Sequence, residues 1–249
     1  MCGRFVAISD LDGLIRFFTV DERQGEDIPP SWNVAPTDPV NAVAAHGGRR
    51  VMVTFRWGLV PAWAKDRRLG SRLINARGET AHAKPAFAAA FARRRCLIPA
   101  DGFYEWERRP DGVRLPFHIA RRDGDPLAFA GLWTSWRDPG HRDAPALRTC
   151  VIVTTTANAT IAPLHDRMPV LLSRSEWDRW LNPETGVDQL QPLLVPAADD
   201  ALAVRRVSTD VNSVRNNHPG LLDPLPRHPG PSAYPRPDAR VVERQTRQV

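Results

Sequence analysis

Residues 102–133 decide the fold class; they read GFYEWERRPDGVRLPFHIARRDGDPLAFAGLW. Three runs rich in aromatic and aliphatic residues are separated by two turn signals, Pro110-Asp111-Gly112 and Asp123-Gly124. Asp-Gly pairs between such runs are typical of tight turns that join antiparallel strands. The stretch therefore predicts a three-strand meander.

Further strands are expected on both sides of this meander. The segments RVMVTFRWGLV (50–60) and RTCVIVTTT (148–156) are rich in β-branched residues, and HDRMPVLL (165–172) looks extended. Helices are few: one is expected over 10–18, one over 85–94 with Pro85 at its first position, and one over 173–181 with Ser173 and Glu176 at capping-box spacing. This pattern predicts an α+β domain with a mostly antiparallel, barrel-like sheet and a few peripheral helices.

Composition indicates one globular domain followed by a tail. The chain has 249 residues, of which 42% are hydrophobic and 25% charged, which is ordinary for a folded protein. We expect a domain over residues 2–218. Residues 219–249 are rich in proline and lack periodicity, so we expect a mostly disordered tail there.

Several features favour a soluble, cytoplasmic protein that does not bind membranes, and we expect a monomer. The longest apolar runs, such as LAFAGLW (127–133), are too short to span a bilayer, and no secretory signal is evident. The three cysteines, Cys2, Cys96 and Cys150, form neither a disulfide framework nor a metal-binding pair. We therefore expect no metal and no cofactor.

The charge balance permits contact with a polyanion without requiring it. Lys and Arg exceed Asp and Glu by 34 to 28, which gives a net charge of +6. Lys65 and Lys84 are the only lysines. The planar fork of arginine suits phosphate, but a GC-rich genome would enrich arginine equally well.

The amino terminus, MCGRF, carries an unusual chemical possibility. Removal of Met1, which the small Cys2 side chain permits, would leave a free α-amine two carbons from a thiol. From these five residues alone, a cysteine at position 2 without any functional role is at least as good an explanation.

Three polar segments lie beside turn signals, where functional residues often gather. They are NARGET with Asn75, PADGFYEW with Glu105, and LHDRMPV with His165. Each also has a plain structural interpretation. Asn75 would cap a turn, Glu105 would face solvent on an alternating strand beside the core-facing Tyr104 and Trp106, and His165 would be a core or turn histidine.

Taken together, the motifs resemble the SRAP family, the SOS-response-associated peptidases or abasic-site processing proteins. Eight blocks carry the resemblance in order over about residues 2–217. They are MCGRF, NVAPT (33–37), RWGLVPAWA (56–64), NARGET (75–80), RRRCLIPADGFYEW (93–106), AFAGLW (128–133), TCVIVTTTAN (149–158) and LHDRMPVLL (164–172). Gly78 stands where many relatives carry serine, and the Pro-rich tail lies outside the shared core.

The resemblance implies a sensor of abasic sites in single-stranded DNA that links itself covalently to the sugar. The Cys2 amine would form an imine with the sugar aldehyde, and the thiol would close a thiazolidine ring. Glu105 would serve as general acid and base, His165 would assist opening of the sugar ring, and Asn75 would hold the amino terminus or the sugar. Weak lyase activity at abasic sites would be a side reaction of the imine.

DNA contacts follow from the same resemblance. Arg4, Arg77 and Arg167 are candidates for phosphate, and Trp63 for base stacking; core packing is the better interpretation of Trp57 and Trp106. Two other functions stay open. One is an N-terminal-nucleophile cysteine peptidase that removes its own Met1, and the other is a non-covalent binder of single-stranded nucleic acid.

Overall fold

The computed structural model describes residues 2–108, 112–141 and 143–225. Within these ranges the strands form two sheets. The first has the order β13 (Leu202–Arg206), β9 (Arg114–Arg121), β8 (Gly102–Arg108), β1 (Phe5–Ala7) and β3 (Ser31–Val34). The second has the order β12 (Arg167–Pro169), β11 (Leu147–Thr156), β10 (Leu127–Trp136), β7 (Arg95–Ala100), β4 (Pro39–His46), β5 (Arg49–Trp57) and β2 (Glu22–Arg23), with β6 (Asn75–Arg77) paired to β11.

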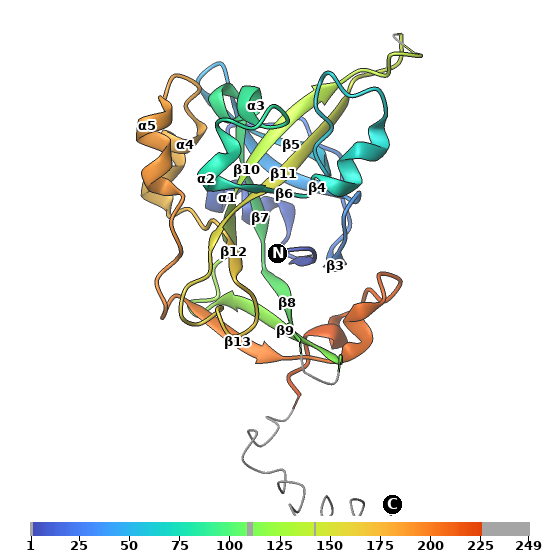
Figure 1. The fold of residues 1–249 in the computed structure, drawn as a ribbon, viewed down its shortest axis with the longest axis vertical. Coiled ribbons are helices and arrows are strands. Elements are labelled where there is room, and N and C mark those ends of the chain that lie inside the picture. Colours follow the sequence, from blue (N-terminus) through green and yellow to red (C-terminus); the bar gives the residue numbers. More distant parts are fainter. Residues whose placement is uncertain (1, 109–111, 142, 226–249) are drawn as a thin grey trace, which may run out of the picture.

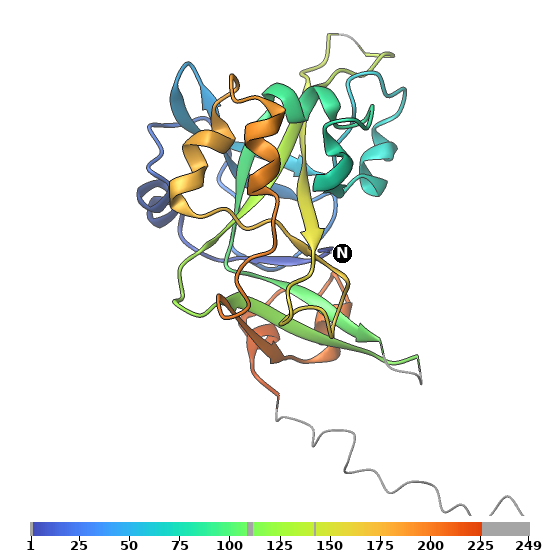
Figure 2. The ribbon, with the colours of Figure 1, turned by 60° about the vertical axis from the view of Figure 1, so that its left-hand side comes forward.

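The second sheet closes on itself. Besides its place in the strand order, β11 pairs in parallel with β5, through Thr149 with Arg56 and Cys150 with Trp57. The path through β5, β4, β7, β10 and β11 thus returns to its start. Figures 1 and 2 show this closed sheet above the smaller first sheet, with the amino terminus between them. The predicted α+β, mostly antiparallel and barrel-like architecture is confirmed.

Strands of the closed sheet are apolar on both faces because both faces are covered. On β4 and β5, Ala42 and Val53 belong to the cluster that contains Cys2, whereas their neighbours Val43 and Met52 pack in the cluster that contains the helices. Continuous apolar runs are expected of strands buried on both sides. This explains why segments such as residues 150–153 show no polar alternation.

The predicted meander is correct in its three strands, but the expected pairing of its second and third strands is wrong. β8 and β9 form the expected hairpin, and the chain turns at Asp123 and Gly124; of the first turn signal, Pro110 and Asp111 lie outside the described residues. β10, however, leaves the hairpin and pairs with β7 and β11, while β13 takes the other edge of β9. The apolar character of β10 on both faces suits the wall of the closed sheet.

The helices lie outside the closed sheet. They are α1 (Leu11–Phe18), α2 (Gly78–Ala81), α3 (Ala88–Arg93), α4 (Trp177–Leu181) and α5 (Val187–Leu190), with 3-10 turns η1 (Arg67–Arg72), η2 (Arg174–Glu176), η3 (Gln191–Leu193), η4 (Thr209–Asn212) and η5 (Pro219–Leu222). None of the helices in the described ranges has the length and apolar character of a bilayer-spanning helix.

Two of the three predicted helix starts are confirmed. Asp10 caps α1 by accepting a hydrogen bond from Gly13 N, and the capping box of Ser173 and Glu176 is present before α4. The prediction that Pro85 opens a helix is wrong. α3 begins three residues later, because Phe87 has a non-helical φ of −122° and ends a turn that starts at Lys84.

The described fold continues beyond residue 218, the expected end of the domain. Residues 219–222 form η5, in which Leu221 is fully buried against Val6 and Tyr104. Leu225 N also donates to Arg206 O. The remainder of the predicted tail, residues 226–249, lies outside the described residues.

A buried arginine binds backbone carbonyls at the ends of two helices. Arg95 Nε donates to Trp180 O and Nη1 to Phe91 O, each at 2.6 Å, and further bonds reach Ala92 O and Asn182 O. Burial lowers the pKa of Arg95 to about 10. The guanidinium therefore satisfies carbonyls at the carboxyl ends of α3 and α4, where the helices themselves supply no donors.

We expect Arg95→Met to lower the free energy of unfolding by about 3 to 5 kcal/mol, because several buried carbonyls lose their donors at once. Equilibrium unfolding in urea measures this difference. Arg93→Met is the matched control: Arg93 is exposed and pairs with the exposed Glu184, so its loss should change stability by less than about 1 kcal/mol. Equal losses for both variants would contradict this role of Arg95.

Candidate active site

Cys2 lies buried directly before β1. Phe5 pairs with Phe103 of β8, and Tyr104 N donates to Arg4 O at 3.0 Å. This pairing fixes the amino-terminal segment beside the start of β8. Burial raises the pKa of the Cys2 thiol, and the nearby carboxylate of Glu105 raises it further. At neutral pH the thiol is thus held in its protonated form.

Asn75 contacts Cys2 directly. It stands at the start of β6, which runs parallel to β11 and pairs Asn75 with Ile152. Its Nδ2 donates to Cys2 O at 2.8 Å. Its Oδ1 is buried and has no hydrogen-bond partner in the described part of the chain. One end of the amide therefore holds Cys2, and the other can accept a hydrogen bond from a further group.

Glu105 is buried beside Cys2. Its exposed fraction is 2%. Burial raises the pKa of its carboxyl to about 7, and the carboxylate of Asp166 acts in the same direction. The interpretation of Glu105 as a solvent-facing strand residue is wrong, because Phe103 packs in the closed sheet and Tyr104 packs under the C-terminal segment, so both faces of β8 are covered.

His165 joins this group through its neighbour. Its Nδ1 lies 2.7 Å from Asp166 Oδ1 and 3.0 Å from the backbone N of Arg167. Asp166 in turn is close enough to Glu105 to raise its pKa. Asn75 thus contacts Cys2 directly, and Glu105 lies close enough to raise the pKa of the Cys2 thiol. His165 stands on the adjoining segment that leads into β12.

The three candidate phosphate-binding arginines differ in how freely they can reach DNA. Arg77 is exposed at the end of β6. Arg4 is half-buried, and its Nη1 donates to Asn33 Oδ1 at 2.6 Å and to Val211 O at 3.0 Å. Arg167 is 9% exposed and is bound by Glu79 through both terminal nitrogens. Arg77 is thus the least restrained of the three, and phosphate contacts by all three stay predictions.

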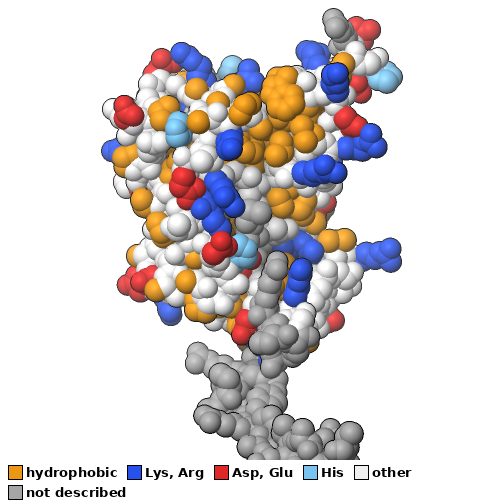
Figure 3. Space-filling model, viewed as in Figure 1, with side chains coloured by type: hydrophobic (Ala, Val, Ile, Leu, Met, Phe, Trp, Pro, Cys, Tyr) orange, Lys and Arg blue, Asp and Glu red, His pale blue; other side chains and the backbone are white. Residues whose placement is uncertain are grey.

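The three tryptophans differ in burial. Trp63 is 63% exposed, as base stacking requires. Trp57 is fully buried and donates from Nε1 to Ile74 O, and Trp106 is half-buried, with Nε1 bound to Asn212 Oδ1. Figure 3 shows Lys and Arg side chains spread over the middle and right of the face on which the amino terminus lies, with hydrophobic side chains exposed above them.

Sequence reasoning assigned no role to two acidic residues of this region. Asp166 acts on both His165 and Glu105, and Glu79 binds Arg167. Both lie inside motifs that had been singled out, LHDRMPV and NARGET. Their spacing gave no signal, because each acts on a residue from a distant part of the chain.

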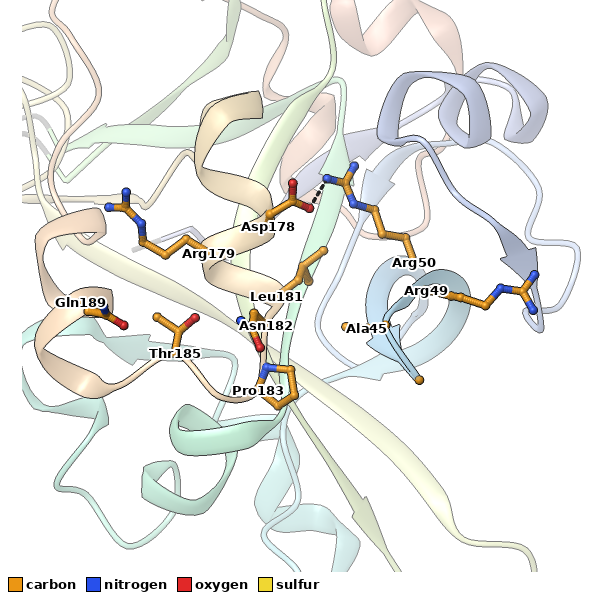
Figure 4. Close-up of a pocket in the computed structure, with 12 residues that line it drawn as sticks. Ala45, Arg49, Arg50, Asp178, Arg179, Leu181, Asn182, Pro183, Thr185 and Gln189 are labelled. Carbon is orange, nitrogen blue, oxygen red and sulfur yellow. Dashed lines mark hydrogen bonds and ion pairs between the residues drawn. The ribbon is translucent and has the colours of Figure 1, made fainter.

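A pocket of about 470 Å³ lies away from these residues, between the β4–β5 hairpin and α4 (Figure 4). One of its three arginines, Arg50, is already paired with Asp178 and donates to Phe18 O. None of the candidate catalytic residues lines it. Within the described ranges, no group of three or more His, Cys, Asp or Glu side chains could hold a metal ion.

Comparison with known proteins gives consistent results. The family model of the SOS response associated peptidase (SRAP) matches residues 1–214. The chain is 41% identical to the abasic site processing protein YoqW of Bacillus subtilis, with 90% of this chain and 99% of that protein covered. It is 43% identical to YoaM of the same organism, with 90% and 98% covered, and 30% identical to HMCES of Gallus gallus, with 90% and 78% covered.

Solved structures share the fold. A protein from Bacteroides thetaiotaomicron superposes with a TM-score of 0.78 at 21% identity, covering 90% of this chain and all of that one. A protein from Bordetella bronchiseptica gives a TM-score of 0.70 at 26% identity, covering 83% of this chain and all of that one. With the family model and the sequence relatives in agreement, the chain belongs to the SOS response associated peptidase (SRAP) family.

Proposed function

We propose that this protein senses abasic sites in single-stranded DNA and links itself to them through Cys2 after removal of Met1. One observation carries the proposal: Asn75 and Glu105 converge on Cys2, where Asn75 Nδ2 binds the Cys2 carbonyl at 2.8 Å and the buried Glu105 has its pKa raised to about 7. The relatives named abasic site processing proteins support the same substrate.

The reaction joins an aldehyde to an aminothiol and releases water. The α-amine of Cys2 attacks C1′ of the open-chain sugar, and the resulting carbinolamine loses its hydroxyl as water to give the imine. The Cys2 sulfur then attacks the imine carbon, the thiol proton passes to the nitrogen, and a five-membered thiazolidine closes. No oxidant or other reactant is needed.

The amine explains why an N-terminal residue suits this chemistry better than a lysine. The reference pKa of an α-amine is about 7.7–8.0 and that of lysine about 10.4, so near pH 7 the neutral fraction of the α-amine is several hundred-fold larger. The amine would act as nucleophile first, and the sulfur would convert a readily hydrolysed imine into a stable ring.

Side chains around Cys2 would move the protons. Glu105, with a pKa near 7, can donate a proton to the departing hydroxyl and can accept one afterwards. The buried Oδ1 of Asn75 would accept a hydrogen bond from the amine or from a sugar hydroxyl. His165 would act on the sugar oxygen, assisting ring opening and reversal of the crosslink.

Arg77, together with Arg4 and Arg167, would contact the phosphates, and Trp63 would stack on an unpaired base. A single strand can bend its abasic sugar into the site at little stacking cost. Linkage would shield the sugar from cleavage where no complementary strand is available for repair. β-Elimination from the imine would give weak lyase activity.

The test uses purified protein and a single-stranded oligonucleotide with one abasic site. We expect a slower band on a denaturing gel that survives heating without borohydride, and a mass equal to protein plus DNA minus one water. A band that needs borohydride would mean an imine alone. No band, with cleavage of a polypeptide substrate instead, would favour the peptidase after which the family is named. A residue added before Cys2 that cannot be removed should abolish the adduct.

A further inference from the structure

A bidentate ion pair reaches across β11 between the two segments that carry Asn75 and His165. Arg167 Nη1 donates to Glu79 Oε1 at 2.7 Å, and Nη2 donates to Glu79 Oε2 at 2.9 Å. Arg167 Nη2 also lies 2.7 Å from Thr154 O. The guanidinium thus holds an acidic side chain from one segment and a backbone carbonyl of the strand between.

The strand pairing explains why this contact bridges the site. On one side of β11, β6 runs parallel and pairs Arg77 with Thr154. On the other side, β12 runs antiparallel and pairs Pro169 with Thr154. Glu79 stands in α2, directly after β6, and Arg167 is the first residue of β12. Both ends of the ion pair therefore lie within a few residues of a candidate catalytic side chain.

The pair is stronger than an ordinary surface contact. Arg167 has a side-chain exposure of 11%, whereas Glu79 is about half exposed. Parallel N–H···O bonds between a guanidinium and a carboxylate fix distance and orientation together. The hydrogen bonds from Arg167 accordingly lower the pKa of Glu79. Their geometry restrains the Arg167 side chain and, with it, the start of β12.

The restraint reaches His165 through one more contact. The backbone N of Arg167 donates to His165 Nδ1 at 3.0 Å. At the other end, the two residues between Asn75 and Gly78 belong to the three-residue strand β6, which pairs with β11 along its whole length. A fixed Glu79 would therefore limit movement of Asn75, and a fixed Arg167 would limit movement of the imidazole.

We propose that Glu79 is a positioning residue, which holds Arg167 and thereby keeps the Asn75 and His165 segments in fixed relation across β11. The inference rests on the proposed function, because its consequence is the rate of crosslinking. Glu79 need not touch DNA. Its loss should slow the reaction of bound DNA without weakening binding.

The charge of Glu79 makes this prediction distinctive. Glu79→Gln removes a negative charge from the region where DNA would bind, so electrostatics alone would give tighter binding and no loss of rate. A positioning role predicts the opposite for the rate. Misplacement of reacting groups by a fraction of an ångström to 1 Å costs about tenfold to a hundredfold, and we expect a fall of this size in the maximal single-turnover rate.

The experiment follows single-turnover crosslinking of wild type and Glu79→Gln over a range of concentrations of abasic single-stranded oligonucleotide. The expected result is the lower maximal rate with an unchanged or lower half-saturating concentration. Glu184→Gln is the matched control, since it removes the same charge from the exposed pair with Arg93. That control should react like wild type. Circular dichroism and thermal melting check the fold of each variant.

A double-mutant cycle with Arg167→Met tests whether the two side chains act as a pair. If they do, the double variant should react no more slowly than the slower single variant. A maximal rate for Glu79→Gln within about twofold of wild type would overturn the inference, as would an effect confined to the half-saturating concentration. Failure of wild type to crosslink at all would instead overturn the proposed function, so the two failures are distinct.

Discussion

A Cys2→Ala variant is expected to form no heat-stable adduct with abasic single-stranded DNA, while it binds the same DNA with nearly the wild-type salt dependence. The variant keeps its α-amine but lacks the sulfur, so the reaction would stop at the imine. We expect the imine to be seen after borohydride reduction. The loss of the heat-stable band should be complete, which makes this the largest effect predicted for any substitution.

The surroundings of Cys2 explain why the sulfur would act second. Burial and the Glu105 carboxylate both raise the pKa of the thiol, so little thiolate is present to react with external electrophiles. The α-amine has a reference pKa of about 7.7–8.0, so a useful fraction of it is neutral and nucleophilic near pH 7. Once the imine has formed, its carbon is bonded to the nitrogen of the same residue that carries the thiol, and ring closure becomes intramolecular.

Two controls separate this role from a general effect of cysteine loss. Cys150→Ala removes another fully buried thiol, on β11, and should leave crosslinking intact. Retention of DNA binding by Cys2→Ala, measured over a range of salt concentrations, shows that the variant is folded and that its phosphate contacts persist. A heat-stable, borohydride-independent adduct of Cys2→Ala would rule out the thiazolidine.

Sequence reasoning succeeded where local pattern decides the structure. Tight turns and apolar runs identified β5, β8, β9, β10 and β11, and the Ser173–Glu176 spacing identified the start of α4. It failed where a long-range pairing decides. Nothing in the residues of β10 reveals that its partners are β7 and β11 rather than β9, because strands covered on both faces fit any wall of the closed sheet equally well.

The candidate site shows the same division. Motifs and family resemblance named Cys2, Asn75, Glu105 and His165, but their residue types alone allowed structural roles for each. The contact of Asn75 with Cys2 joins residues 73 positions apart, so only the folded chain could reveal it. Glu105 likewise lies close to Cys2 and Asp166, which come from distant parts of the sequence.

Glu105→Gln should lower the rate of crosslinking by about a hundredfold to ten-thousandfold, the usual contribution of a positioned general acid or base. Glutamine keeps the size of the side chain but cannot give up a proton to the departing hydroxyl. Glu107→Gln is the matched control, because it lies two residues further along β8 and is only half-buried. That variant should retain most of the wild-type rate.

The pH dependence sharpens this prediction. As general acid, Glu105 must be protonated, so the wild-type rate should fall as pH rises above about 7. The α-amine must be neutral, so the rate should also fall as pH drops below its reference pKa of about 8. Wild type should therefore react fastest between about pH 7 and 8, whereas Glu105→Gln should lose the alkaline fall and keep the acidic one.

Stability should change in the opposite direction from activity. Folding raises the pKa of Glu105 from its ordinary value of 4.5 to about 7, so ionising the buried carboxyl costs free energy, and wild type should lose stability as pH rises from about 4.5 to 7. Glutamine never ionises, so at pH 8 Glu105→Gln should be more stable than wild type, by on the order of 3 kcal/mol. Thermal melting at pH 5 and pH 8 measures this difference.

Two outcomes would contradict the role of Glu105. A variant that is slow because it is poorly folded would melt below wild type at both pH values. An alkaline fall in rate that persisted in Glu105→Gln would assign the titrating proton to another group.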